Sequence, residues 1–233
     1  MKYRCIIFDL DGTLADTIPD IAQAMNRALA EEGFATVDEA AYSAMVGWGI
    51  RRLAELALPP SARTEEAVKR IAARAERVYH ENPLVRTKVY PGMAGIAGAL
   101  AEKHIKTAVL SNKPDEVTRS VVNGLFPPGS FGAIRGGRPG IPLKPDPFAV
   151  MEILAELDRV PRDTVFAGDS EIDMRTARES GCFPLGVSWG YRPRSVLEEA
   201  GAAVIVDSPA ALLSFMLEDG FVPHGKSGTG GAP

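Results

Sequence analysis

CIIFDLDGTL, residues 5–14, begins with four apolar residues and continues with two aspartates, Asp9 and Asp11, that are separated by one residue. Four apolar residues rich in isoleucine predict a strand buried on both faces, and its carboxyl end brings Asp9 to the sheet edge where open α/β proteins bind ligands. Alternation along an extended chain returns the side chain of Asp11 toward that of Asp9, and Gly12 allows a sharp turn. Two carboxylates this close repel, so we expect them to share a proton or bind a cation. A surface turn is the alternative, because Asp-Gly is also a hairpin signal.

Two further motifs carry groups that suit a phosphoryl site. Residues 107–110 predict a second strand, and Ser111-Asn112 follows it just before a predicted helix start with proline and acids. Hydroxyl, amide and unpaired backbone N–H groups at a helix N-terminus favour an anion, so these residues are candidates to bind phosphate; a plain helix cap is the alternative. Lys144 lies beside two prolines ahead of another predicted helix. A fixed cation suits a phosphoryl site, although most lysines are only solvated.

The fourth motif is GDSEID at residues 168–173, which follows a predicted strand at 164–167 and begins a predicted helix. If Asp169 lies beside Asp9, a cation bound by both has oxygen ligands alone. This donor set favours Mg²⁺ over zinc or copper, with water and substrate phosphate completing an octahedron. Asp173 fits a supporting role, and its alternative is an ordinary acid in the first turn of a helix.

In this order the four motifs resemble those of the haloacid dehalogenase superfamily of phosphohydrolases, over roughly residues 5–206. The resemblance implies that Asp9 is the nucleophile and forms an aspartyl-phosphate that water then hydrolyses. It implies that Asp11 is the general acid and base, and that its backbone carbonyl also binds the metal. Asp9 and Asp169 would supply the carboxylate ligands of a Mg²⁺ cofactor.

The same resemblance implies two further groups of residues. The side chains that would hold the phosphoryl oxygens are Ser111, Asn112 and Lys144, the last of which also counts as catalytic. Those that would support the metal ligands are Thr13, Ser170 and Asp173. Charge spreads over the phosphoryl oxygens in the transition state, where one well-aimed donor contributes about 3 kcal/mol.

The type of reaction is indicated by two differences between this chain and other members of the superfamily. Dehalogenases lack the second aspartate, which here is Asp11. Phosphonate-cleaving members replace that aspartate and use a cap lysine, but this chain has no lysine between Lys2 and Lys69. Both differences favour hydrolysis of a phosphate ester. A β-phosphoglucomutase-like phosphosugar mutase and a pyrophosphatase stay open on the same motifs, and a catalytically idle ligand-binding protein is the alternative outside enzymes.

The substrate is suggested by a segment between the first two motifs. VGWGIRR, residues 46–52, resembles the corresponding segment of phosphoglycolate phosphatases, so 2-phosphoglycolate is the leading candidate. Arg51 in this segment is a candidate to bind a substrate carboxylate, because guanidinium and carboxylate match in a two-pronged geometry. A solvated helix arginine is the alternative.

The pattern along the chain predicts an α/β fold. Strand-like and helix-like segments alternate from residue 88 onward, which indicates a Rossmann-like parallel-sheet core with helices on both faces. Four segments between the first strand and residue 88 have helical spacing and predict a small all-α cap inserted after that strand. The expected domains are a discontinuous core at 1–15 and 88–222, the cap at 16–87 and a flexible Gly-rich tail at 223–233.

Bulk composition fits a soluble enzyme. The 233 residues are 45% hydrophobic and 24% charged, with no apolar run long enough to cross a bilayer and no signal-peptide pattern at the start. A net charge of −4 offers no general attraction for nucleic acid. We therefore expect a cytoplasmic monomer or homodimer whose partner is a small phosphorylated metabolite, with no nucleic-acid or membrane partner.

Overall fold

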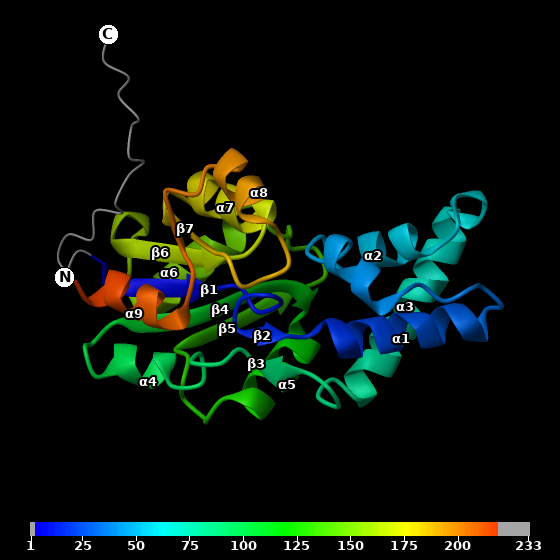
Figure 1. The fold of residues 1–233 in the computed structure, drawn as a ribbon, viewed down its shortest axis with the longest axis horizontal. Helices are drawn as coiled ribbons and strands as arrows, with labels where there is room; N and C mark the ends of the chain where they lie inside the picture. Colours follow the sequence, from blue (N-terminus) through cyan, green and yellow to red (C-terminus); the bar gives the residue numbers. More distant parts are fainter. Residues whose placement is uncertain (1–2, 219–233) are drawn as a thin grey trace, which may run out of the picture.

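A six-stranded parallel sheet forms the centre of the computed structural model, which describes residues 3–218 (Figure 1). The strand order is β5-β4-β1-β6-β7-β8, and every pair is parallel. The strands are β1 Cys5–Phe8, β4 Lys106–Pro114, β5 Ala133–Gly137, β6 Thr164–Gly168, β7 Phe183–Val187 and β8 Val204–Val206. The chain extends the sheet to one side of β1 and then to the other, so a topological switch point lies at the carboxyl end of β1, where α/β proteins bind ligands.

Helices cover both faces of this sheet, as the alternation along β1 shows. Ile6 and Phe8 belong to one buried cluster, whereas Cys5 and Ile7 belong to a second. The first cluster includes side chains of α4 Ile96–Ala101, α5 Asp115–Leu125 and α9 Pro209–Leu217, and the second includes those of α6 Phe148–Leu157 and α7 Glu171–Ser180. Successive strand residues point to opposite faces, so both faces are packed. The predicted α/β Rossmann-like class is confirmed.

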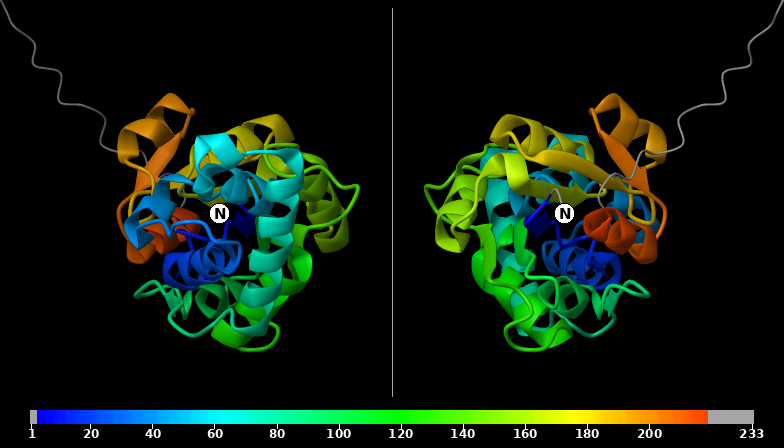
Figure 2. Two further views of the ribbon diagram at one scale, coloured as in Figure 1. Left: turned by 90° about the vertical axis from the view of Figure 1, so that its right-hand side faces the viewer. Right: turned by 90° about the vertical axis from the view of Figure 1, so that its left-hand side faces the viewer.

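A group of helices lies between β1 and β4 in the chain and at the carboxyl ends of the strands. It comprises α1 Ile18–Glu31, the 3₁₀ helix η1 Glu39–Ala44, α2 Ile50–Ala57, the 3₁₀ turn η2 Pro60–Ala62 and α3 Glu65–Glu81. In the left view of Figure 2 these blue to cyan helices lie in front of the sheet. Within residues 3–218, no helix has the length and apolarity needed to cross a membrane.

The two chain crossings between this helical segment and the sheet lie side by side. Ala15–Asp16 (β2) pairs antiparallel with Lys88–Val89 (β3). The buried carboxylate of Asp20 in α1 accepts hydrogen bonds from the backbone N–H groups of Arg86 and Thr87, at 2.9 and 2.8 Å. The expected cap at 16–87 begins and ends at this ladder, and its bounds stay a prediction. The predicted tail at 223–233 lies outside the described residues.

Two elements differ from the expectation in ways that matter for the site. The strand expected at 107–110 runs on to Pro114, with a register shift against β5 between Leu110 and Pro114. The edge strand β5 was not predicted, because two of its five residues are glycine. Gly136 is needed there: a Cβ atom would lie 2.5 Å from the Cα atom of Asp115.

Candidate active site

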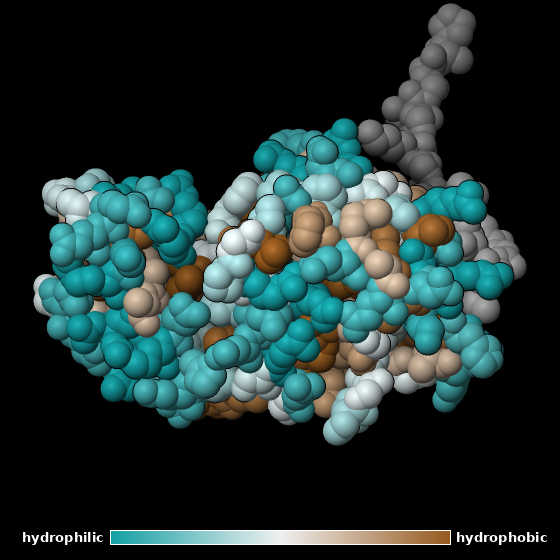
Figure 3. Space-filling model, turned by 180° about the vertical axis from the view of Figure 1, so that it is seen from behind, coloured by the Kyte–Doolittle hydropathy of each residue, from teal (hydrophilic) through white to brown (hydrophobic). Residues whose placement is uncertain are grey.

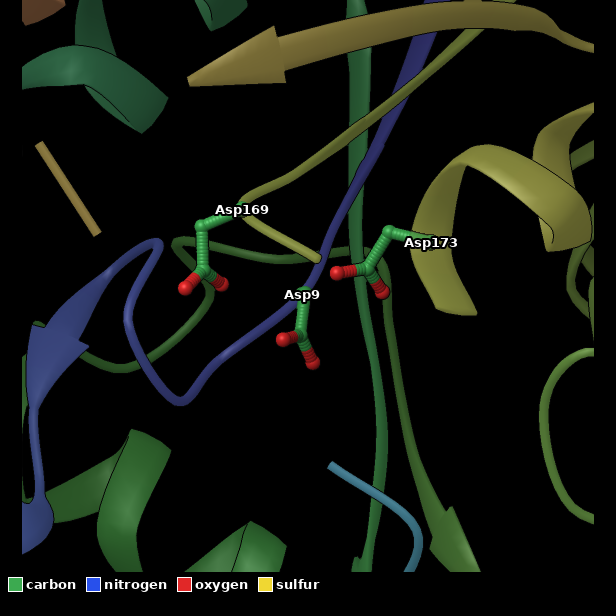
Figure 4. A group of neighbouring side chains, drawn as sticks. All are labelled: Asp9, Asp169 and Asp173. Carbon is green, nitrogen blue, oxygen red and sulfur yellow. The ribbon is translucent and has the colours of Figure 1, made fainter. Parts of the chain in front are cut away.

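Three buried carboxylates gather at the switch point. Asp9 follows β1, Asp169 follows β6, and Asp173 lies in the first turn of α7. One oxygen from each lies within 4.8 Å of the others. Figure 4 shows the three carboxyl groups facing a common space, with Asp169 and Asp173 on either side of Asp9. The two strands are neighbours in register, which brings the residues after their ends together.

Asp169 is held without a direct cation partner among the described residues. Its Oδ1 accepts a hydrogen bond from Thr13 Oγ1 at 3.1 Å, and its Oδ2 accepts one from the backbone N–H of Tyr191 at 2.7 Å. Gly12, at φ +87°, lies so close that a Cβ atom would be 2.3 Å from Oδ2. Burial, aided by the neighbouring Asp173, raises the pKa of Asp169 to about 7. A cation bound here would favour the ionised form.

Lys144 bridges the other two carboxylates. Its Nζ lies 2.7 Å from Oδ1 of Asp9 and 2.7 Å from Oδ1 of Asp173. Burial alone would lower the pKa of Lys144, but the two aspartates raise it above its ordinary value, so the ammonium stays charged. Burial and Asp173 raise the pKa of Asp9, and Lys144 opposes that shift. Lys144 therefore favours the ionised carboxylate that a nucleophile requires.

Both carboxylate oxygens of Asp173 accept hydrogen bonds. Its Oδ1 accepts from Lys144, and its Oδ2 accepts from the backbone N–H of Ser170 at 3.1 Å and from Ser170 Oγ at 2.6 Å. The Ser170 hydroxyl in turn caps α7, which completes a capping box. Asp173 thus positions Lys144 and the start of α7, in agreement with a supporting role.

The donor set fits a divalent cation. Three buried carboxyl groups, those of Asp9, Asp169 and Asp173, gather here around a single ammonium, that of Lys144. The candidate ligands are all oxygens, which suit Mg²⁺. The residues that would hold the ion are Asp9 and Asp169: Asp169 has no ion pair with a cation among the described residues, whereas Asp173 pairs with Lys144 and accepts two bonds from Ser170.

Asp11 lines the same cavity, in contact with a lysine that none of the four motifs includes. Its Oδ1 accepts from Thr17 Oγ1 at 2.5 Å and lies 3.0 Å from Nζ of Lys113. Lys113 Nζ also donates to the hydroxyl of Tyr79 in α3, at 2.6 Å. Burial alone would lower the pKa of Lys113, but Asp11 and Tyr79 raise it. The only sequence signal for Lys113 is its place directly after Ser111-Asn112.

Asn112 has a different set of contacts from the one expected. Its Nδ2 donates to the backbone oxygens of Gly47 and Lys144, at 2.8 and 3.0 Å, and its Oδ1 accepts from the backbone N–H of Lys144 at 2.8 Å. Both amide hydrogens and the amide oxygen are therefore engaged, so the side chain braces the backbone and has no donor left for a phosphoryl group. Ser111 lines the cavity, and its Oγ accepts from the backbone N–H of Lys113 at 3.2 Å.

The cavity lies between the sheet edge and the cap helices. Core residues Asp9, Ser111 and Lys144 form one wall. The cap contributes apolar side chains and two polar ones, namely Ile21, Ala24, Val46, Ile50, Leu53, Ala75, Glu76 and Tyr79. Seen from behind, the surface is hollowed between the lobe of α1, α2 and α3 and the rest of the molecule, with hydrophobic side chains at the junction (Figure 3).

Arg51 lies away from this cavity. Its side chain is 61% exposed and forms an ion pair with Glu65 at 2.5 Å. It lines a separate surface groove beside Trp48 and Arg52. The structure therefore does not bring Arg51 together with the other predicted site residues. A different arginine reaches the cavity: Arg192 donates to backbone oxygens of the cap, including that of Val46 at 2.9 Å.

Comparison with known proteins agrees with this geometry. The family model of haloacid dehalogenase-like hydrolases matches residues 6–187. A phosphoglycolate phosphatase of Rhodospirillum rubrum is 33% identical over 99% of this chain and 96% of its own length, and one of Aquifex aeolicus is 35% identical over 81% and 86%. The crystal structure of a candidate phosphoglycolate phosphatase from Lactobacillus delbrueckii superposes with a TM-score of 0.88 at 32% identity, covering 94% of this chain and all of the other. The chain belongs to the haloacid dehalogenase-like hydrolases, as a phosphoric monoester hydrolase of the phosphoglycolate phosphatase-like kind.

Proposed function

We propose that this enzyme hydrolyses 2-phosphoglycolate in a Mg²⁺-dependent reaction through a phosphoryl group carried on Asp9. One observation supports the chemistry most: the carboxyl groups of Asp9 and Asp169 and the ammonium of Lys144 lie around one buried space. The similarity to phosphoglycolate phosphatases over nearly the whole chain supports the substrate. Two buried free thiols, Cys5 and Cys182, support action in the reducing cytoplasm.

The residues divide the reaction into two displacements. An oxygen of Asp9 forms a bond to phosphorus while the bond between phosphorus and the ester oxygen breaks, and Asp11 gives its proton to that departing oxygen. Asp11 then takes a proton from water, whose oxygen attacks phosphorus and releases the Asp9 carboxylate and inorganic phosphate. Lys144 and Ser111 would bind the phosphoryl oxygens. Bound Mg²⁺ would supply further positive charge to those oxygens.

The cavity favours a small ester over a sugar phosphate. A sugar presents several hydroxyl groups, each of which needs a hydrogen-bond partner when water is excluded. The cap side of the cavity offers Glu76 and Tyr79 and is otherwise apolar, with Ile21 and Leu53 among its side chains. This composition supports hydrolysis of a short phosphomonoester rather than phosphosugar isomerisation.

A panel of phosphate esters with Mg²⁺ tests the proposal. We expect release of inorganic phosphate from 2-phosphoglycolate at a higher kcat/KM than from sugar phosphates or pyrophosphate, with no isomerised sugar product. Asp9→Asn should abolish turnover while the circular dichroism spectrum and unfolding midpoint stay those of a folded protein. Normal hydrolysis by that variant would remove Asp9 from the reaction, and isomerisation of a sugar phosphate would favour the mutase.

A further inference from the structure

Lys113 is a cation in the cavity wall to which the proposed reaction gives no task. Among the described residues, three cations line the cavity: Lys113, Lys144 and Arg192. Lys144 pairs with Asp9 and Asp173, and the proposed reaction assigns its remaining donor to the phosphoryl oxygens. Arg192 is engaged by both cap and core, because its guanidinium donates to the backbone oxygen of Val46 and pairs with Glu171 of α7 at 3.3 Å. Lys113 is therefore the cation left for a substrate group other than the phosphoryl group.

The position of Lys113 is defined by one residue of the core and one of the cap. Its Nζ lies 3.0 Å from Oδ1 of Asp11 and 2.6 Å from the Tyr79 hydroxyl, and it sits 4.1 Å from the centre of the Tyr79 ring. The side chain is only 4% exposed. An ammonium carries three N–H donors. The interactions within residues 3–218 engage two of them, which leaves one donor for a ligand in the cavity.

We propose that Lys113 binds the carboxylate of the substrate's leaving group and so selects phosphate esters of 2-hydroxy acids. This inference rests on the proposed function, in which Asp11 protonates the ester oxygen. An ammonium 3.0 Å from a carboxylate oxygen of Asp11 lies close to the group that follows that ester oxygen. In 2-phosphoglycolate the carboxylate carbon is two bonds from the ester oxygen, so the two ends of the substrate can reach Asp11 and Lys113 together.

The rest of the cavity supports this choice. The cap side chains opposite the phosphoryl site include Ile21, Leu53 and Ala75, which offer a carboxylate no donor, and Glu76, which would repel it. A buried anion needs a charged or hydrogen-bonding partner, and apolar surroundings strengthen the pairing with one. Because Tyr79 belongs to the cap helix α3, cap and core together hold the ammonium in place.

A pair of esters that differ only in the carboxylate tests the proposal. Ethyl phosphate has a methyl group where 2-phosphoglycolate has its carboxylate. Lys113→Met keeps most of the apolar stem and removes the charge. We expect the KM for 2-phosphoglycolate to rise about 10- to 100-fold, the range for one charge-assisted hydrogen bond. The KM for ethyl phosphate and inhibition by inorganic phosphate should stay near their wild-type values. Lys113→Arg should restore part of the preference for the carboxylate ester.

Three other variants separate this role from the alternatives. Tyr79→Phe removes only the hydroxyl that orients Nζ of Lys113, and we expect it to raise the KM for 2-phosphoglycolate by a smaller factor than Lys113→Met does. The same variant tests the proposal if Lys113→Met fails to fold. Arg52→Met removes an exposed cap cation and should leave the ratio of the two KM values unchanged. If Arg51→Met rather than Lys113→Met lowers the preference for 2-phosphoglycolate, the proposal is overturned in favour of Arg51.

Binding without turnover gives a second readout. In the Asp9→Asn background, calorimetric titration should show that Lys113→Met weakens binding of 2-phosphoglycolate but not of inorganic phosphate. Equal effects on both ligands, or equal effects on both esters in the active enzyme, would show that Lys113 acts only through Asp11 and would overturn the proposal. Wild-type hydrolysis of both esters at one kcat/KM would overturn the carboxylate role alone. Hydrolysis of neither ester would reject the proposed function and this inference with it.

Discussion

Replacing Asn112 should destabilise the protein without weakening phosphate binding directly. The side chain makes three hydrogen bonds: to the backbone oxygens of Gly47 and Lys144 and from the backbone N–H of Lys144. At about 1 kcal/mol for each bond, Asn112→Ala should lower the free energy of unfolding by about 3 kcal/mol. Asn112→Asp should cost more, because a carboxylate oxygen would replace the donor that faces two carbonyl oxygens at 2.8 and 3.0 Å.

Urea denaturation followed by circular dichroism measures this effect. With a slope of about 3 kcal/mol per M for a protein of this size, the midpoint of Asn112→Ala should fall by about 1 M. Asn123 is an exposed residue of α5, so Asn123→Ala provides a matched amide control and should unfold near the wild-type midpoint. The inhibition constant of inorganic phosphate gives the second readout. An unchanged midpoint for Asn112→Ala, together with weaker inhibition by phosphate, would refute the bracing role and restore the phosphoryl contact expected from the motif.

Three further outcomes follow from the structure. Gly12→Ala should abolish Mg²⁺-dependent activity in steady-state assays, because its Cβ would displace the Asp169 carboxylate, and full activity would contradict this. Gly33→Ala is the control: Gly33 has a similar φ of +78° and no atom within 4 Å of the added Cβ, so the variant should lose about 1 kcal/mol of stability and keep its activity. Asp20→Ala should lower the free energy of unfolding in urea by about 3 kcal/mol, because the backbone N–H groups of Arg86 and Thr87 and the Thr87 hydroxyl lose their acceptor. A change near zero would count against these contacts. Burial raises the pKa of Cys5 to about 12 and that of Cys182 to about 11, so both thiols stay protonated at pH 8. A thiol reagent should therefore label them only in denaturant, and rapid labelling of the folded protein would contradict this.

The motif spacing was enough to predict which strand ends carry the acidic side chains. Asp9 and Asp169 each follow a short apolar run, and parallel strands place their carboxyl ends at one edge, so local patterns determine the meeting of residues far apart in the chain. The sequence also indicated the cap helices and a helix beginning within the fourth motif. Those predictions depend on periodicity and on the chemistry of helix ends, which short windows of sequence contain.

Contacts between the cap and the core could not be predicted in the same way. Lys113 meets Tyr79 across 34 positions of sequence, and neither residue belongs to a local pattern that points to the other. A strand that ends before Asn112 predicts a phosphate ligand at the following helix start. In the structure β4 continues past Asn112, and the side-chain amide donates to the backbone oxygens of Gly47 and Lys144. Arg51 has the residue type for a carboxylate contact, but its helix presents it to solvent. Tertiary packing, rather than residue type, decides these roles.

The covalent intermediate gives the most direct test of the central claim that Asp9 carries the phosphoryl group. The wild-type enzyme is mixed with 2-phosphoglycolate and Mg²⁺, quenched in acid within one turnover, digested and analysed by mass spectrometry. We predict one phosphoryl group on the peptide that contains Asp9 and none in an Asp9→Asn sample. Rapid release of inorganic phosphate by the wild-type enzyme with no phosphoryl group on that peptide at any quench time would contradict the account.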